Sequence, residues 1–236
     1  MTNQRGGVHR KVIMTIAAAG TLAAFETSNI QLLYSEGFNG DTFIYDTVDA
    51  KKTTVTFEHF RTWAYGDLFM FADATDGTRF DGDAEQIYGE ISPRLSAGKL
   101  LDRDLSAGPV TDLYAAAQYN GGEGYEAWLF GLGCDIALPG FDFFNANFYR
   151  KKQNIGPLTW QFSAAYRTHT WEGWHFNGFV DITDYEVNTQ HQLLYDVGRS
   201  WMQEGKLFAG SEWLYYRDSD ADVDTSVFQA MIKYRF

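Results

Sequence analysis

The sequence predicts an all-β fold, a transmembrane antiparallel β-barrel of about 12 strands that follows an N-terminal signal peptide. Three observations predict this fold. Apolar and polar residues alternate with a period of two in segments of about ten residues, turns rich in Gly, Asp and Asn separate the segments, and aromatic residues make up 17% of the chain. A barrel wall needs an apolar row facing lipid, a polar row facing the lumen and aromatic girdles at both membrane interfaces.

Residues 1–24 form the predicted signal peptide, which leaves residues 25–236 as the predicted outer-membrane barrel. Arg5, Arg10 and Lys11 make a basic start, and residues 12–24 (VIMTIAAAGTLAA) are a short apolar stretch. That stretch is too short for a membrane-spanning helix, which needs about 20 apolar residues. The alternative is an amphipathic helix that the mature protein keeps. No later run of about 18 apolar residues appears, so the sequence predicts no helical span.

The C-terminal segment shows the alternation best, with Phe228 and Ile232 on one face and Gln229 and Lys233 on the other. The four prolines of the chain leave such segments long. Twelve segments of this kind are expected at 29–36, 52–65, 67–75, 85–97, 110–120, 124–136, 142–153, 158–170, 173–183, 189–200, 205–217 and 224–236.

An even number of strands places both termini on the periplasmic side. The connections then alternate between short periplasmic turns and longer, more polar outer ones, and the long periplasmic stretch 97–109 is the exception. Two aromatic girdles emerge: a periplasmic one with Trp63, Tyr65, Trp171, Trp174, Trp201, Tyr234 and Phe236, and an outer one with Tyr119, Tyr125, Trp213, Tyr215 and Tyr216. The alternative, a soluble lipocalin-like or sandwich fold, would want polar outward rows and apolar inward rows.

The charge balance argues against a nucleic acid polymer as a partner. The chain holds 31 acids and 19 bases, a formal charge of −12; removing residues 1–24 removes three bases and no acid, so 16 bases face 31 acids and the charge becomes −15. Phosphate binding needs a basic surface instead. The single cysteine, Cys134, excludes an intramolecular disulfide and a cysteine-based metal site.

No motif points to catalysis, a metal or a cofactor. Asp218, Asp220 and Asp222 resemble the start of a calcium loop, but Val223 stands where that loop needs Gly and Gln229 where it needs Glu. We interpret this stretch as a solvated outer loop. The histidines do not cluster, and no nucleophile elbow or phosphate loop is present. We therefore expect no enzyme activity.

The inward rows combine acids, bases, amides and rings, which suits polar, ring-bearing solutes that stack on an aromatic face and bond at their edges. The alternative is that opposite charges cross-link the wall and fill the barrel. The inward row includes Glu58, Tyr88, Glu90, Arg94, Asp112, Asn145, Asn147, Tyr149, Lys151, Arg167, Asp181, Glu212, Lys233 and Arg235.

Several segments resemble the nucleoside-specific outer-membrane channel family of Tsx-like and OmpK-like proteins. They are residues 67–73 (DLFMFAD), 90–100 (EISPRLSAGKL), 104–109 (DLSAGP) and 129–136 (LFGLGCDI). Tyr34-x-x-x-Phe38 also resembles the start of the family, where an aromatic residue contributes to the nucleoside site. This chain is shorter, and Phe38-Asn39 replaces the family's Phe-Gly. The resemblance is clearest over residues 30–150 and accounts for the long stretch 97–109.

The resemblance implies a narrow, monomeric twelve-stranded barrel in the bacterial outer membrane, in contact with its lipid and lipopolysaccharide, whose outer loops serve phages or colicins as a receptor. It implies passive passage of nucleosides or similar small polar solutes. We expect a weak lumen site in which Phe38, Tyr88 and Tyr149 stack on the base. Glu58, Glu90, Arg94 and Asn147 would line the path. The alternatives are a plugged barrel with a structural or adhesive role and a barrel enzyme acting on lipids.

Overall fold

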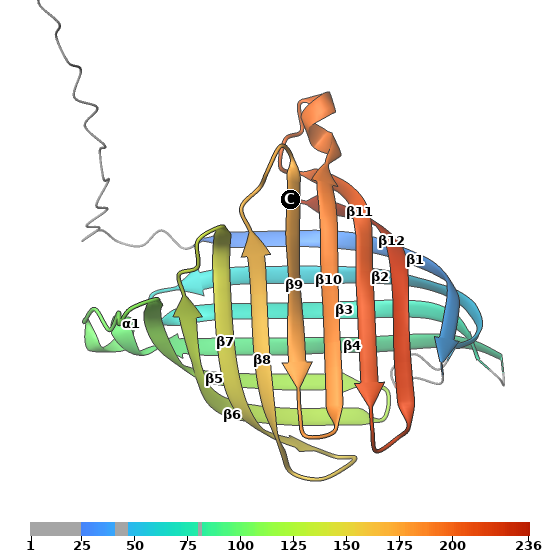
Figure 1. Ribbon diagram of the computed structural model, residues 1–236, viewed down its shortest axis with the longest axis horizontal. Helices are drawn as coiled ribbons and strands as arrows, with labels where there is room; N and C mark the ends of the chain where they lie inside the picture. Colours follow the sequence, from blue (N-terminus) through green and yellow to red (C-terminus); the bar gives the residue numbers. More distant parts are fainter. Residues whose placement is uncertain (1–24, 41–46, 80–81) are drawn as a thin grey trace, which may run out of the picture.

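The computed structural model describes the backbone of residues 25–40, 47–79 and 82–236, and the side chains of residues 25–36, 51–76 and 86–236. The predicted signal peptide lies outside these residues. Twelve antiparallel strands close into a barrel in which β1 pairs with both β2 and β12 (Figure 1). No helix of the described residues is long and apolar enough to cross a membrane.

The twelve strands agree with the twelve predicted segments, and their ends differ from the prediction by a few residues. Strand β10 begins at Glu186, earlier than predicted, and includes residues that the sequence analysis had placed in a loop. In chain order the strands are β1 (Glu26–Gly40), β2 (Thr47–Trp63), β3 (Gly66–Arg79), β4 (Gly82–Ser96), β5 (Val110–Gly122), β6 (Tyr125–Ile136), β7 (Phe141–Gln153), β8 (Thr159–Thr168), β9 (Trp174–Ile182), β10 (Glu186–Asp196), β11 (Leu207–Asp218) and β12 (Val223–Arg235).

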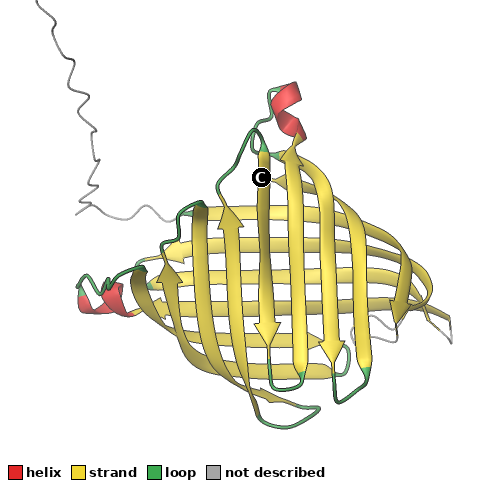
Figure 2. Cartoon of the chain, viewed as in Figure 1, coloured by secondary structure: helices red, strands yellow, loops and turns green. Residues whose placement is uncertain are grey.

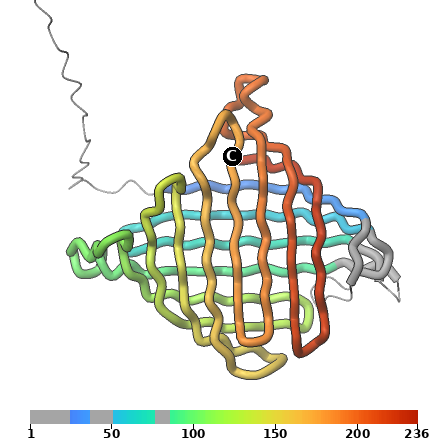
Figure 3. The backbone as a smooth tube through the Cα atoms, in the orientation of Figure 1, coloured from blue at the N-terminus to red at the C-terminus, as the bar shows by residue number. Residues whose placement is uncertain are grey.

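The two ends of the barrel differ. One carries the short helix α1 (Ala97–Leu101), the 3-10 helix η1 (Val197–Trp201), Phe25 and the C-terminus; we call it the helix-bearing end (Figure 2). The other carries the turns 123–124, 154–158, 183–185 and 219–222, and we call it the turn-bearing end (Figure 3). Both ends of the described chain therefore lie at the same mouth, as the even strand count predicts.

The outer face of the wall is apolar. Ile87, Leu132 and Phe228 are 70–73% exposed, and each alternates along its strand with less exposed residues that face inward. An apolar surface this continuous is unfavourable in water and is satisfied by lipid hydrocarbon. The apolar rows of the sequence thus face outward, as in a membrane barrel, and the alternative of a soluble lipocalin-like or sandwich fold is wrong.

Apolar side chains also pack inside the lumen. Leu33, Leu194, Phe208 and Met231 all point inward and form a buried apolar cluster. A second inward cluster surrounds Tyr149, which is 1% exposed. Strands β6 and β7 approach so closely that a Cβ on Gly131 would lie 1.9 Å from the carbonyl oxygen of Phe148. Side chains therefore fill much of the barrel interior.

The stretch 97–109 at the helix-bearing end is ordered by one carboxylate. Asp112 accepts hydrogen bonds from the Ser96 hydroxyl and from the backbone N–H of Gly98 at 3.0 Å. The Ser96 hydroxyl also accepts from the N–H of Lys99 at 2.9 Å and so caps α1. Asp102 ends the helix in the left-handed conformation with a φ of 50°.

Candidate functional site

A cavity of about 320 Å³ opens at the turn-bearing end of the lumen. Eight neighbouring strands, from β4 round to β11 with β6 represented by its first residue, contribute side chains to its wall. The lining is mixed: tyrosines and a few aliphatic side chains alternate with amides and charged groups. This combination of shape and chemistry is that of a small-molecule site.

Tyr88 and Glu90 form one side of the cavity. They are two residues apart on β4 and so point the same way, and the Tyr88 hydroxyl donates to the Glu90 carboxylate at 2.6 Å. Gln118 on β5 donates to the other Glu90 oxygen at 2.8 Å and also to Asn120 at 2.8 Å. The carboxylate is therefore held in place by neutral donors from two strands.

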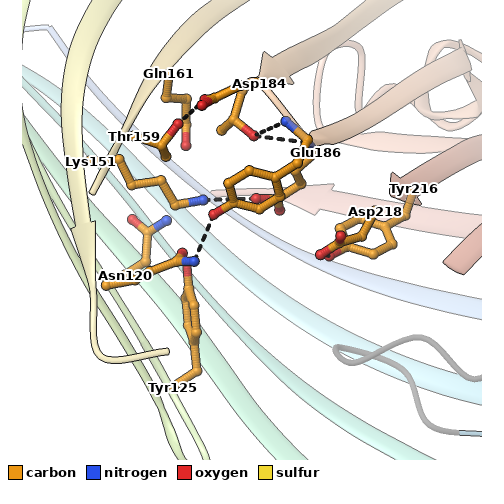
Figure 4. Close-up of polar contacts among 12 residues, drawn as sticks. Asn120, Tyr125, Lys151, Thr159, Gln161, Asp184, Glu186, Tyr216 and Asp218 are labelled. Carbon is orange, nitrogen blue, oxygen red and sulfur yellow. Dashed lines mark hydrogen bonds and ion pairs between the residues drawn. The ribbon is translucent and has the colours of Figure 1, made fainter. Parts of the chain in front are cut away.

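Lys151 and Glu186 form the opposite side (Figure 4). The Lys151 ammonium lies 2.9 Å from the Glu186 carboxylate, and the two side chains are 4% and 15% exposed. Next to them Gln153 donates to the Tyr185 hydroxyl at 2.8 Å. Thr183 accepts from the backbone N–H of Glu186 at 2.8 Å and fixes the start of β10.

Four tyrosines give the cavity its aromatic surface. The Tyr88 and Tyr125 rings contact each other with centroids 6.3 Å apart, and Tyr216 on β11 and Tyr185 also line the cavity. Tyr185 belongs to the turn just before β10 begins at Glu186. A flat heteroaromatic ring can stack on such faces while its polar edge reaches the surrounding amides and carboxylates.

Arg94 lies deeper, toward the helix-bearing end, and is fully engaged by the protein itself. Its guanidinium makes a two-pronged contact with Asp67 at 2.8 and 2.7 Å and reaches Asp135 at 2.9 Å. It also lies over the Tyr114 ring, 4.2 Å from the centroid. The arrangement ties the neighbouring strands β3, β4, β5 and β6 together on the inner face of the wall.

Glu58 belongs to a second internal network on the other side of the lumen. Its carboxylate accepts from Asn29 at 2.8 Å and lies 3.1 Å from the Lys233 ammonium. Lys233 also donates to Gln192 at 3.3 Å, and Gln192 donates to Glu212 at 2.8 Å. Polar groups from β1, β2, β10, β11 and β12 thus satisfy one another inside the barrel.

Of the seven residues predicted to bind a solute, the structure brings Tyr88 and Glu90 together at the cavity. Glu58, Arg94, Asn147 and Tyr149 point into the lumen but do not line the cavity, and the side chain of Phe38 lies outside the described residues. Their binding roles remain predictions.

Sequence reasoning missed several residues that line the cavity. It placed Tyr125 and Tyr216 in the outer aromatic girdle, yet both face the cavity, and Tyr216 is 3% exposed. It placed Tyr185 and Glu186 in an outer loop. The inward parity of β6 and β11 would have identified the first two, whereas the early start of β10 has no clear signal in the sequence. Among the described residues no group of three or more His, Cys, Asp or Glu could hold a metal ion.

A closed twelve-stranded barrel with an apolar exterior and a polar cavity at one mouth defines a porin-like membrane barrel. The KdgM porin structure has the same architecture, with a TM-score of 0.53 and 8% identity over 88% of this chain and 99% of that one. Residues 48–193 match the family described as "Nucleoside-specific channel-forming protein, Tsx". The chain belongs to that family, and its barrel is a barrel of the bacterial outer membrane.

Individual relatives agree with this assignment. The nucleoside-specific channel-forming protein Tsx of Escherichia coli O157:H7 is 32% identical over 147 residues, which is 56% of this chain and 48% of that protein. Tsx of Klebsiella aerogenes is 27% identical over 193 residues, 73% and 64% of the two chains. The outer membrane protein OmpK of Vibrio parahaemolyticus is 30% identical over 87 residues, 36% and 33%. The chain spans about half the length of the first of these relatives.

Proposed function

We propose that the protein is a passive outer-membrane channel for nucleosides or similar small polar, ring-bearing solutes, with a weak binding site in the lumen. The observation that carries the proposal is the cavity at the turn-bearing end, where four tyrosines surround amides and carboxylates. A nucleoside combines a flat ring with hydroxyl and amide edges, so this wall offers a partner for each part of it. Membership of a family of nucleoside-specific channels supports the same solute class.

In this proposal Tyr88 and Glu90 are the central contacts, because they line the cavity and are already oriented by one another. Phe38, Glu58, Arg94, Asn147 and Tyr149 are proposed to contact the solute elsewhere along its path. The turn-bearing end would face the cell exterior and the helix-bearing end the periplasm, as the strand count implies.

The remaining parts of the proposal follow from the same assignment. Residues 1–24 are a signal peptide removed on export, residues 25–236 act as a monomeric barrel in contact with lipid and lipopolysaccharide, and the outer turns serve as a receptor for phages or colicins. We also propose that the chain performs no catalysis, because the relatives that it matches are channel-forming proteins.

One observation favours a second candidate, a barrel plugged by its own side chains with a structural role. The networks around Arg94 and Lys233, together with the apolar cluster of Leu33 and Met231, fill the lumen toward the helix-bearing end. In such a barrel the cavity would be a closed pocket. The first candidate, a channel, requires a continuous path for the solute past these side chains.

Single-channel recording of the refolded protein in a planar bilayer separates the two candidates. The channel predicts a small, steady conductance that adenosine or thymidine blocks and a sugar of similar size does not. Conductance that ignores nucleosides would leave a general small-solute pore. An absence of conductance would favour the plugged barrel.

A further inference from the structure

The cavity at the turn-bearing end has a strongly unequal charge. Among the described residues that line it there is one base, Lys151, against six acids. The acids are Glu90, Glu123, Asp181, Glu186, Asp218 and Asp220. The formal balance of the lining is therefore −5.

The single base does not offset this charge for an incoming solute. The Lys151 ammonium is 2.9 Å from Glu186, and its side chain is 4% exposed. Its positive charge is therefore largely neutralised by the Glu186 carboxylate. An anion that entered the cavity would have to displace a carboxylate from a buried ammonium. That exchange is unfavourable, because the displaced carboxylate would remain close by and unpaired.

Two of the remaining acids lie inside the barrel, where water screens them least. Glu90 receives hydrogen bonds from Tyr88 and Gln118, and Asp181 receives them from Ser163 and Gln161. All four donors are neutral, so no hydrogen-bonded base cancels the charge of either carboxylate. The two carboxyl groups act on each other electrostatically and repel when both are ionised, so we count the pair as about one negative charge rather than two. Acids in a narrow cleft with low-dielectric walls focus a negative potential within it.

The aromatic surface favours the same sign of charge. The faces of the tyrosine rings carry the negative part of the ring quadrupole and attract an ammonium or guanidinium that lies over them. Tyr88, Tyr125, Tyr185 and Tyr216 surround the cavity from different strands, so a bound solute meets several rings. Rings and carboxylates together make a wall that suits a cationic ring-bearing solute.

We propose that this cavity selects by charge: it binds ring-bearing solutes that carry an ammonium group more tightly than neutral ones, and it rejects those that carry a phosphate. Glu90 and Asp181 are the residues that determine this selectivity. The inference deepens the proposed function and rests on it, because it names the charge class of nucleoside that the channel takes. A potential of a few kT in the cavity corresponds to on the order of tenfold preference per unit charge.

The reversal potential of the refolded full-length chain in a planar bilayer, under a KCl gradient without nucleoside, tests the sign of the selectivity. The wild type should favour potassium over chloride by about tenfold. The double variant Glu90→Gln, Asp181→Asn should lose most of that preference. Asp224→Asn is the matched control, since Asp224 is exposed, lies on β12 at the same end and points away from the lumen. A wild type with no preference, or one for chloride, would overturn the proposal.

Equilibrium dialysis of the detergent-solubilised protein gives a reading that does not depend on conductance. The probes are 5′-amino-5′-deoxyadenosine, adenosine and adenosine 5′-monophosphate. Affinity should fall in that order, by on the order of tenfold at each step. Equal affinities, or no binding of any probe, would overturn the charge preference.

The failures of the two proposals are distinguishable. Block by adenosine in a pore without cation preference would leave the nucleoside channel standing and remove the charge filter. Cation preference in a pore that adenosine does not block would support the charge filter and remove the nucleoside channel.

Discussion

At the scale of single residues, Arg94 shows how a predicted binding residue can have a structural role. Its guanidinium is already bonded to Asp67 and Asp135 and covered by the Tyr114 ring, and the side chain is 8% exposed. A charged group that is buried and paired in this way costs much less than one left alone. The geometry therefore indicates that Arg94 mainly stabilises the folded barrel.

Replacing this arginine should destabilise the barrel. Arg94→Met leaves the Asp67 carboxylate buried and unpaired, which costs about 3–5 kcal/mol in the free energy of unfolding. Denaturant unfolding of the refolded protein in detergent measures the loss. The double variant Arg94→Met, Asp67→Leu should recover much of it, because an apolar pair replaces the ion pair. Unchanged stability with weaker nucleoside block would instead make Arg94 a binding residue.

The candidate site was predictable from the sequence where a strand keeps its alternation, and not elsewhere. Tyr88 and Glu90 follow from the inward parity of β4, and the structure places both at the cavity. Parity tells which side of the wall a residue faces, but not its height or whether a neighbour already binds it. For that reason it could not separate Tyr88 from Arg94. Tyr185 could not be predicted to line the cavity, because it lies in the turn before β10, where the alternation of a strand does not apply.

At the scale of elements, the stretch 97–109 departs from the pattern of short turns at its end of the barrel. Asp112 on β5 holds it by accepting hydrogen bonds from Ser96 and Gly98, one on each side of the start of α1. A five-residue helix has little stability of its own. Its order depends on these contacts.

Asp112→Ala should therefore loosen α1 while the barrel stays closed. Asp112 holds the Ser96 hydroxyl that caps α1, and the loss of such a cap corresponds to about 1–2 kcal/mol of local stability. Limited proteolysis within residues 97–109 should become faster. Asp104→Ala is the matched control, because Asp104 is exposed and accepts one backbone hydrogen bond, from Ser106. Equal proteolysis rates for the two variants would show that Asp112 does not order the stretch.

The number and order of strands could be read from the sequence because lipid enforces the alternation on the outer face. Phe228 and Ile232 must point outward whatever fills the lumen. The inner face carries no such rule. Leu33, Leu194, Phe208 and Met231 stand at inward positions and pack together, although the inward rows were identified from their polar residues. Contacts across the lumen join strands far apart in the chain, and a single sequence does not reveal them.

At the scale of the whole molecule, the barrel combines an open cavity at one end with packed side chains toward the other. The bridge between Lys233 and Glu58, 3.1 Å long, joins β12 to β2 across β1. This network and the one around Arg94 both lie inside the lumen. In the proposed channel we expect these internal bridges to limit the conductance.

Removing the bridge between Lys233 and Glu58 should widen the lumen at this point. Lys233→Ala removes a long side chain that is 6% exposed inside the lumen, and single-channel conductance should rise. Lys206→Ala is the matched control, because Lys206 is exposed outside the strands at the same end. An unchanged conductance in Lys233→Ala, from a barrel that still unfolds cooperatively, would show that the path avoids this bridge.

The adenosine concentration that halves the single-channel current of Tyr88→Ala shows whether the nucleoside binds in the cavity at the turn-bearing end. Tyr119→Ala serves as the control, because Tyr119 is also a rim tyrosine but packs on Trp128, with centroids 4.6 Å apart, on the outer face. If it does, Tyr88→Ala should raise the half-blocking concentration by about tenfold or more, since stacking on a base is worth about 1–3 kcal/mol, while Tyr119→Ala should leave it unchanged. The same half-blocking concentration in the wild type and in Tyr88→Ala would show that the nucleoside does not bind in this cavity.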